Sequence, residues 1–174
     1  EERAVTGIIL MGGKSRRFGQ DKVMTPVGDK PLIEHVIEAI APLMDDIILV
    51  GPARPGLSDM KRVDDLIPDC GPMGGIYTAL MTTASTFSFV FAADMPTIHP
   101  GLVAYMQSLA KAQDVIVPVW SGGFEPLHAI YNRTMLNIIE PLVLARKLRI
   151  DRVFDQVAVE KVPEGVLRRY GEPR

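Results

Sequence analysis

Residues 5–13 of this chain read VTGIILMGG, a near-continuous apolar run that stops at a pair of glycines. Strands that read as unbroken hydrophobic runs are typically buried on both faces of a parallel sheet. The two glycines let the backbone turn and come close to a ligand at the end of the strand. This stretch therefore predicts the first strand of a parallel α/β sheet, followed by a loop suited to ligand binding.

Apolar runs of strand length recur along the chain and alternate with segments whose apolar residues are spaced three and four apart. The expected strands are residues 5–11, 46–50, a short one ending at Val63, 87–93, 115–119, 126–131 and 157–162. The expected helices are residues 31–44, 74–84, 100–112 and 134–144, with Pro141 expected to break or kink the last one. The alternation predicts an α/β fold with three layers, a mostly parallel sheet and right-handed crossovers, which is a Rossmann-like arrangement.

The composition narrows the classes of protein that fit. A chain of 174 residues suits one domain, and its single cysteine, Cys70, excludes an internal disulfide and a thiolate-rich metal site. Its 19 basic and 21 acidic residues lack the bulk positive charge that is typical of nucleic-acid binders. We expect no membrane span, because no apolar run approaches 18 residues. No long apolar stretch near the N-terminus resembles a signal peptide, so we expect a cytoplasmic protein.

The loop after the first strand concentrates positive charge. Residues 12–22 (GGKSRRFGQDK) carry Lys14, Arg16, Arg17 and Lys22 beside three glycines. Arginine forks and lysine point charges match phosphate oxygens, and consecutive free N–H groups can form an anion-binding nest. The loop is neither a Walker A motif nor a G-x-G-x-x-G fingerprint. A solvated basic turn is the alternative, but the position after a buried strand favours phosphate binding.

Two aspartates are candidates for the same edge of the sheet. Asp94 directly follows the apolar run at residues 87–93, and Asp65 follows the strand candidate ending at Val63. Magnesium typically takes one or two protein carboxylates together with substrate phosphates and waters. The glycines of residues 71–75 (GPMGG) permit a further close approach of ligand. Turn or N-cap aspartates are the alternative reading. Cations, a metal and backbone donors together favour phosphoryl or nucleotidyl transfer.

These motifs resemble those of a known family, the molybdenum cofactor guanylyltransferases. Residues 10–22 resemble its signature L-A-G-G-x-S-x-R-M-G-x-D-K, with Met and Phe at two of the apolar positions. Residues 65–76 (DLIPDCGPMGGI) are similar to its D-x-x-P-x-x-G-P-L-x-G-I motif. Residues 92–96 (AADMP) are similar to its metal motif, and residues 125–131 (EPLHAIY) to its P-L-x-A-x-Y segment on the pterin side.

The resemblance implies a nucleotidyltransferase fold and a magnesium-dependent enzyme that transfers GMP from GTP to molybdopterin and releases pyrophosphate. It implies one nucleotidyltransferase domain over residues 1–174, with nucleotide bound by the first half and pterin by the second. Molybdoenzymes or their chaperones are expected as recipients of the product. The family usually ends with an N-x-N-T-P-E segment, which residues 171–174 do not show.

The resemblance also implies roles for individual residues. Nucleotide binding is expected of the following residues, the first three at the guanine and ribose: Leu10, Gly12, Gly13, Lys22, Asp65 and Asp94. Arg17, Lys22 and Asp94 are the expected catalytic residues: the first two neutralise the triphosphate, and Asp94 holds magnesium. The Gly12-Gly13 pair favours GTP, since related cytidylyltransferases tend to have Ala-Gly at this place.

Several alternatives remain open from the sequence. The protein is either this guanylyltransferase, another nucleotidylyltransferase making a cytidine cofactor or a sugar nucleotide, or a non-catalytic nucleotide-binding partner in cofactor insertion. His128 is either a structural histidine or a substrate contact. Trp120 either lines a pterin pocket or belongs to a hairpin turn with residues 121–124 (SGGF).

Overall fold

A mixed, mostly parallel sheet forms the centre of the protein, for which a computed structural model describes residues 4–13, 21–95 and 97–171. The sheet of these described residues has eight strands in the order β10-β7-β9-β6-β1-β4-β5, with β8 paired to β7. The strands are β1 (Val5–Leu10), β4 (Asp46–Val50), β5 (Lys61–Val63), β6 (Phe87–Ala92), β7 (Val115–Trp120), β8 (Gly123–Phe124), β9 (His128–Asn132) and β10 (Val159–Val162). A small hairpin, β2 (Pro26–Val27) and β3 (Lys30–Pro31), lies apart from it.

The direction of the strands confirms the expected parallel core and adds one exception. β1 runs parallel to β4 and β6, β4 parallel to β5, and β7 parallel to β10. β9 is antiparallel to both of its neighbours, β6 and β7. The chain reaches β9 from β7 through the short strand β8, without a helix, and only antiparallel neighbours can be joined by so short a connection.

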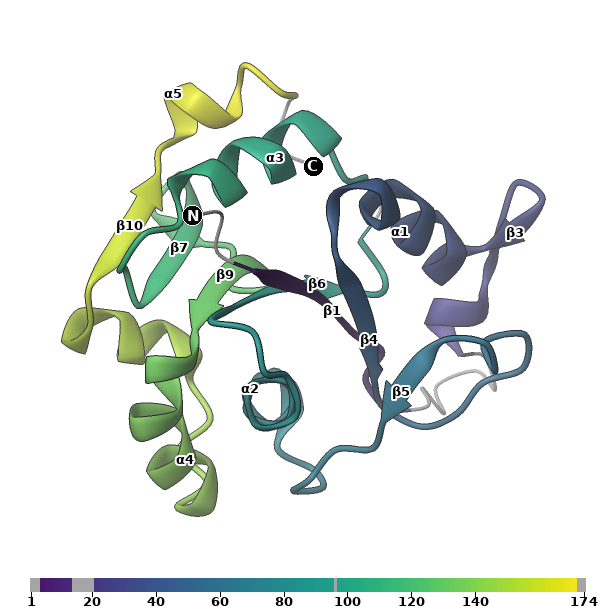
Figure 1. Ribbon diagram of the computed structural model, residues 1–174, viewed down its shortest axis with the longest axis horizontal. Helices are drawn as coiled ribbons and strands as arrows, with labels where there is room; N and C mark the ends of the chain where they lie inside the picture. The colour runs from purple at the N-terminus through teal and green to yellow at the C-terminus, as the bar shows by residue number, and fades with distance from the viewer. Residues whose placement is uncertain (1–3, 14–20, 96, 172–174) are drawn as a thin grey trace.

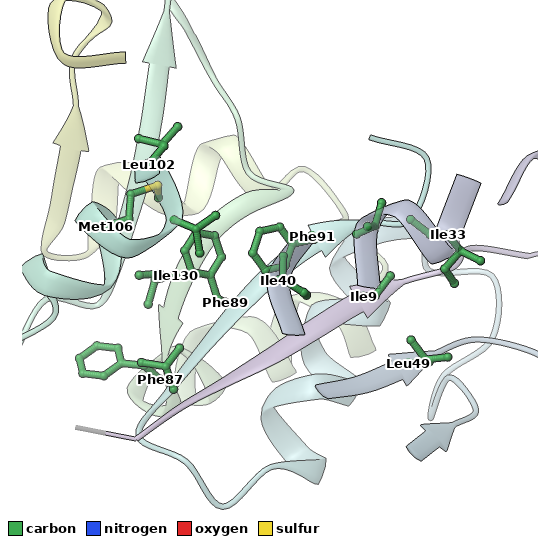
Figure 2. Packing of buried hydrophobic residues seen from close by; sticks show 14 of the residues in the cluster. Ile9, Ile33, Ile40, Leu49, Phe87, Phe89, Phe91, Leu102, Met106 and Ile130 are labelled. Atoms are coloured by element: carbon green, nitrogen blue, oxygen red, sulfur yellow. The ribbon is translucent and has the colours of Figure 1, made fainter. Parts of the chain in front are cut away.

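Helices cover both faces of the sheet. Figure 1 shows α1 (Leu32–Ile40), α3 (Pro100–Leu109) and α5 (Glu164–Leu167) on one side, with α2 (Gly71–Thr82) and α4 (Leu136–Leu144) on the other. Two hydrophobic clusters result, one on each face. Ile9 faces the first cluster and Ile8 the second, and neither side chain is exposed. Figure 2 shows the first cluster, where Phe89 and Phe91 of β6 pack near Ile130. The three layers expected from the sequence are confirmed.

The boundaries of all four expected helices differ from the sequence expectation, and α3 ends at Leu109 instead of residue 112. α1 ends at Ile40 and continues as the 3₁₀ turn η3 (Ala41–Leu43), while α2 begins at Gly71, earlier than expected, with Pro72 in its first turn. α4 follows the 3₁₀ turn η4 (Arg133–Met135) and is not broken at Pro141. The carbonyl that loses a donor there belongs to Asn137, which is exposed and can be solvated.

The remaining described elements are two 3₁₀ turns. These turns are η2 (Lys22–Met24), which follows the first loop, and η5 (Ile150–Gln156), which precedes β10. None of the described helices is long and apolar enough to cross a membrane.

The order of the strands reverses at β1. The chain leaves β1 through α1 to β4 and β5 on one side, and then returns through α2 to β6 on the other side. In open α/β sheets, ligands bind outside the carboxyl ends of the strands at such a reversal. The topology therefore points to the ends of β1, β4 and β6, at Leu10, Val50 and Ala92.

Candidate functional site

A pocket of about 800 Å³ opens at the carboxyl ends of β1, β4 and β6. Its wall includes residues from the first loop, the loop after β5, the start of α2 and the segment after β6. It contains every described residue that the sequence singles out for nucleotide binding: Leu10, Gly12, Gly13, Lys22, Asp65 and Asp94. Arg17, the remaining candidate, lies outside the described residues.

Backbone hydrogen bonds hold the strand ends together beneath this pocket. The N–H of Met11 donates to the carbonyl of Val50 at 2.9 Å, and the N–H of Ala93 donates to the carbonyl of Leu10 at 3.0 Å. The glycine loop and Asp94 therefore begin from neighbouring, fixed points.

Gly12 and Gly13, at the start of the first loop, are exposed on the wall of the pocket. Gly12 has a φ of +68°, a conformation that side chains disfavour. A methyl group on Gly12 or Gly13 would meet no described atom within 4 Å. The packing of the described residues therefore does not demand glycine at Gly13, and none of their atoms fills the space beside either glycine.

Arg54 is a buried cation beneath the first loop. Its side chain is 1% exposed, and its Nε donates to Oδ2 of Asp21 at 2.8 Å. Its Nη2 donates to the carbonyl of Gly12 at 3.1 Å and lies 3.4 Å from that of Met11, while Nη1 donates to the carbonyl of Pro52 at 2.9 Å. The guanidinium thus joins the start of the first loop to the residue at its end.

Nothing in the sequence singles out Arg54 as buried. It lies in a segment rich in proline and glycine (residues 52–56, PARPG), where an arginine is ordinarily exposed. The one available signal is its place, since it follows a buried strand at the same sheet edge as the first loop.

The loop after β4 approaches the first loop closely. Gly51 has a φ of +135°, and a methyl group on it would lie 3.1 Å from the carbonyl oxygen of Gly12. The N–H of Gly51 donates to the carbonyl of Val63 at 2.9 Å, and the carbonyl of Gly51 accepts from Arg62 Nη1 at 2.9 Å. Gly51 therefore lets the two loops pack against each other, which fixes one side of the pocket.

Asp65, in the segment after β5, also lines the pocket. Burial raises the pKa of its carboxyl group, and the nearby charge of Asp64 raises it further. The segment is anchored to α2, because the N–H of Leu66 donates to the hydroxyl of Thr78 at 3.0 Å, and that hydroxyl donates to the carbonyl of Gly74 at 2.9 Å. A half-buried carboxylate on a fixed loop is suited to accept hydrogen bonds from a ligand.

The start of α2 also contributes to the pocket wall. Gly71, Pro72 and Gly75 line the pocket. A methyl group on Gly75 would lie 2.9 Å from Cδ2 of Leu10, so glycine lets α2 pack on the end of β1 without displacing that side chain. The N-terminal end of a helix favours negative charge, and here that end faces the pocket.

Asp94 is exposed at the end of β6. Within residues 4–13, 21–95 and 97–171, no group of three or more acidic, histidine or cysteine side chains is arranged to hold a metal ion. Magnesium commonly needs only one or two carboxylates when substrate phosphates and waters complete its shell. Asp94 on the wall of an open pocket, with Asp65 on the same wall, fits a metal held jointly by protein and substrate.

His128 and Trp120 are explained by packing. His128 is 5% exposed and meets the rings of Phe89 and Phe91 edge-on, with both centroids 5.4 Å from its own. Burial lowers its pKa to about 4, and it is not among the described residues of the pocket wall. Trp120 belongs to the β7–β8 hairpin, whose turn has positive φ at Ser121 and Gly122. Both residues thus have packing contacts of their own, and a contact of either one with substrate stays a prediction.

Comparison with known proteins gives consistent results. The sequence matches the MobA-like NTP transferase domain over residues 7–160. It is 36% identical over 169 residues to a protein of Pelotomaculum thermopropionicum named "Probable molybdenum cofactor guanylyltransferase", covering 96% of this chain and 82% of that one. A protein of the same name from Natranaerobius thermophilus is 32% identical, with 97% of this chain and 86% of its own length covered.

A solved structure shares the fold. The crystal structure of molybdopterin-guanine dinucleotide biosynthesis protein A from Archaeoglobus fulgidus superposes with a TM-score of 0.80. The match covers 95% of this chain and 86% of that one, at 24% identity.

Proposed function

The chain belongs to the MobA-like NTP transferase domain family and is a nucleotidyltransferase, and on that premise we propose that it transfers GMP from GTP to molybdopterin. The products are the guanine dinucleotide form of the cofactor and pyrophosphate. The proposal takes residues 1–174 as one nucleotidyltransferase domain, with nucleotide bound by the first half and pterin by the second.

The observation that carries the proposal is the pocket at the strand reversal. It unites a glycine loop, the cation of Lys22 and the carboxylates of Asp65 and Asp94 at one sheet edge. Nucleotidyl transfer needs little covalent work from the protein, because positioning and charge stabilisation supply most of the rate. These groups are the ones such a reaction requires.

Each group has a distinct part in the proposed reaction. Leu10 and the backbone of Gly12 and Gly13 hold the guanine and ribose, and Asp65 accepts hydrogen bonds from the nucleotide. Lys22, with Arg17, neutralises the triphosphate and the departing pyrophosphate. Asp94 holds Mg²⁺, which when bound supplies further positive charge to the phosphate oxygens.

The choice of GTP over CTP rests on space at the first loop. The absence of side chains at Gly12 and Gly13 leaves room on the pocket wall, where an added methyl group would meet no described atom within 4 Å. A purine is wider than a pyrimidine and makes use of that room. A cytidylyltransferase is the second candidate, because the pocket, at about 800 Å³, is also large enough for CTP.

The test is thermal unfolding of the protein with Mg²⁺ and GTP, CTP or ATP, followed by a pyrophosphate-release assay with molybdopterin. A ligand at about 100 times its dissociation constant adds roughly 2.7 kcal/mol of stability. We expect a shift of several degrees with GTP only, and pyrophosphate release that depends on molybdopterin. Protection by CTP alone favours the cytidylyltransferase, and GTP binding without transfer favours a non-catalytic partner in cofactor insertion.

A further inference from the structure

Arg54 contacts residues at both ends of the first loop. Its guanidinium donates to the carbonyl of Gly12 at 3.1 Å and lies 3.4 Å from that of Met11, at the start of the loop. It also pairs with the carboxylate of Asp21, directly before Lys22, at 2.8 Å. One side chain, only 1% exposed, thus joins the two points between which the loop must span.

Peptide geometry gives this arrangement a consequence for the nucleotide. In a trans peptide the C=O and the next N–H point in opposite directions. When the carbonyls of Met11 and Gly12 turn inward to Arg54, the N–H groups of Gly12 and Gly13 turn outward. Both glycines are exposed on the pocket wall, and neither N–H donates to another residue within the described ranges.

We propose that Arg54 is a positioning residue for nucleotide binding, which holds the first loop so that the N–H groups of Gly12 and Gly13 face the bound nucleotide. This inference rests on the proposed function for the identity of that nucleotide. Arg54 itself does not touch the ligand. Without it, the two carbonyls lose their donors, and the peptides are free to present oxygens, in place of N–H donors, to the guanine and ribose.

Because Arg54 is paired with Asp21, its role is not simply to attract the phosphates by its positive charge. The carboxylate lies against the guanidinium, so the net charge of the pair is close to zero. Asp21 also accepts from the N–H of Met24 at 3.1 Å through its carbonyl, which closes the turn η2. Holding Asp21 in place therefore also fixes the backbone of Lys22 at the pocket wall.

The replacement of Arg54 by lysine, R54K, tests the proposal because it keeps the charge and loses the fork of donors. We expect kcat/KM for GTP to fall roughly 100-fold, as for other displacements of about 1 Å at a reacting group. KM for molybdopterin should not change. The matched control is R133Q, since Arg133 Nη1 donates to the carbonyl of Thr83 at the other edge of the sheet. R133Q should lose thermal stability and keep wild-type KM and kcat.

A second variant and a measurement on the wild-type protein keep the test decisive if R54K does not fold. D21N keeps the shape of the side chain that pairs with Arg54 and removes its charge. We expect kcat/KM for GTP to fall in this variant too, but by less than in R54K. In the wild-type protein, titration with GTP should shift the ¹H–¹⁵N amide signals of Gly12 and Gly13. Unchanged amide signals on saturation with GTP overturn the proposal.

The outcomes distinguish this proposal from the proposed function. If the wild-type protein binds GTP but transfers no GMP, the proposed function is wrong. The amide shifts of Gly12 and Gly13 then still test whether their N–H groups face the nucleotide. A folded R54K protein with wild-type KM and kcat for GTP defeats the role of Arg54 and leaves the function intact.

Discussion

The N–H of Ala93 donates a hydrogen bond to the carbonyl of Leu10 at 3.0 Å, across the point where β6 and β1 end side by side. Gly12 and Gly13 follow the first of these strand ends, and Asp94 follows the second. Because the bond lies just outside the regular pairing of the two strands, it holds the glycine loop and the carboxylate in a fixed relation. The proposed site is therefore built on β6, the central strand of the order, and its parallel neighbour β1.

The replacement D94N tests the proposed metal ligand. Asp94 is exposed, so we expect the free energy of unfolding to change by less than about 0.5 kcal/mol. Loss of the carboxylate should lower kcat of guanylyl transfer by roughly 100-fold or more, because charge at the phosphates is no longer offset. Steady-state kinetics at several Mg²⁺ concentrations checks this, with the Mg²⁺ needed for half-maximal rate rising in the variant.

Asp155 provides the matched control for D94N. It is also exposed, but it lies in η5, away from the pocket wall. D155N should match the wild-type protein in rate and in its dependence on Mg²⁺. Equal rates for D94N and D155N would show that Asp94 holds no catalytic metal.

The replacement G75A tests the contact between α2 and the end of β1. The added methyl group would lie 2.9 Å from Cδ2 of Leu10, so the leucine side chain, which lines the pocket, would have to move. Overpacking of this kind costs about 1–3 kcal/mol, and we expect urea unfolding to show that loss. Displacement of Leu10 should also raise KM for GTP. In the control G165A, the methyl group meets nothing within 4 Å, so neither property should worsen.

The sequence predicts the sheet and its edge because both depend on local patterns. Unbroken apolar runs identify β1, β4, β6 and β7, and the strand ends then place Leu10, Asp65 and Asp94 at one edge. The direction of β9 could not be predicted from its own residues, since a hydrophobic run reads alike in either direction. It depends on the short connection through β8.

Arg54 shows what local patterns leave out. Its burial depends on Asp21, which is 33 positions away in sequence, and on carbonyls of residues 11 and 12. The D-K pair at the end of the loop is visible in the sequence, but the cation that holds its aspartate is not. Contacts between two loops of different strands have no periodicity that a reading along the chain can detect.

The pH dependence of stability should report the burial of His128. Its pKa is about 4 in the folded protein and 6.5 in a model peptide, so the unfolded chain binds more protons between these values. Stability is therefore highest above about pH 6.5 and falls as the pH decreases toward 4. We expect this residue to remove roughly 2 kcal/mol between pH 7.5 and pH 5.

Urea unfolding at the two pH values measures this effect, and H128L serves as the comparison. The leucine variant lacks the titrating group and should lose less stability on acidification than the wild-type protein. The neighbouring His99 also lowers the pKa of His128, so H99Q should reduce the effect slightly. An equally steep loss of stability in H128L would show that other groups carry the acid sensitivity.

The carboxylate of Asp65 should lower the stability of the fold and strengthen the binding of GTP. Burial, and secondly the charge of Asp64, raise its pKa above the usual value, so ionisation opposes folding as the pH rises through this range. D65N removes that charge, and at pH 7 we expect a protein that unfolds at a higher temperature and binds GTP more weakly. Such opposite effects mark a residue kept for its ligand rather than for the fold.

The replacement D64N, at the neighbouring residue, tests whether these effects are specific to Asp65 or follow from the loss of any acidic charge. Asp64 is exposed and pairs with Arg62 at 2.7 Å, so its loss removes an ion pair together with its repulsion of Asp65 and should change stability little. Asp64 lines the same pocket as Asp65, so D64N and D65N each remove one negative charge from the pocket wall. If D65N and D64N change the unfolding temperature and the affinity for GTP alike, the effect is one of net charge. If only D65N gains stability while losing affinity, the half-buried carboxylate itself contacts the nucleotide.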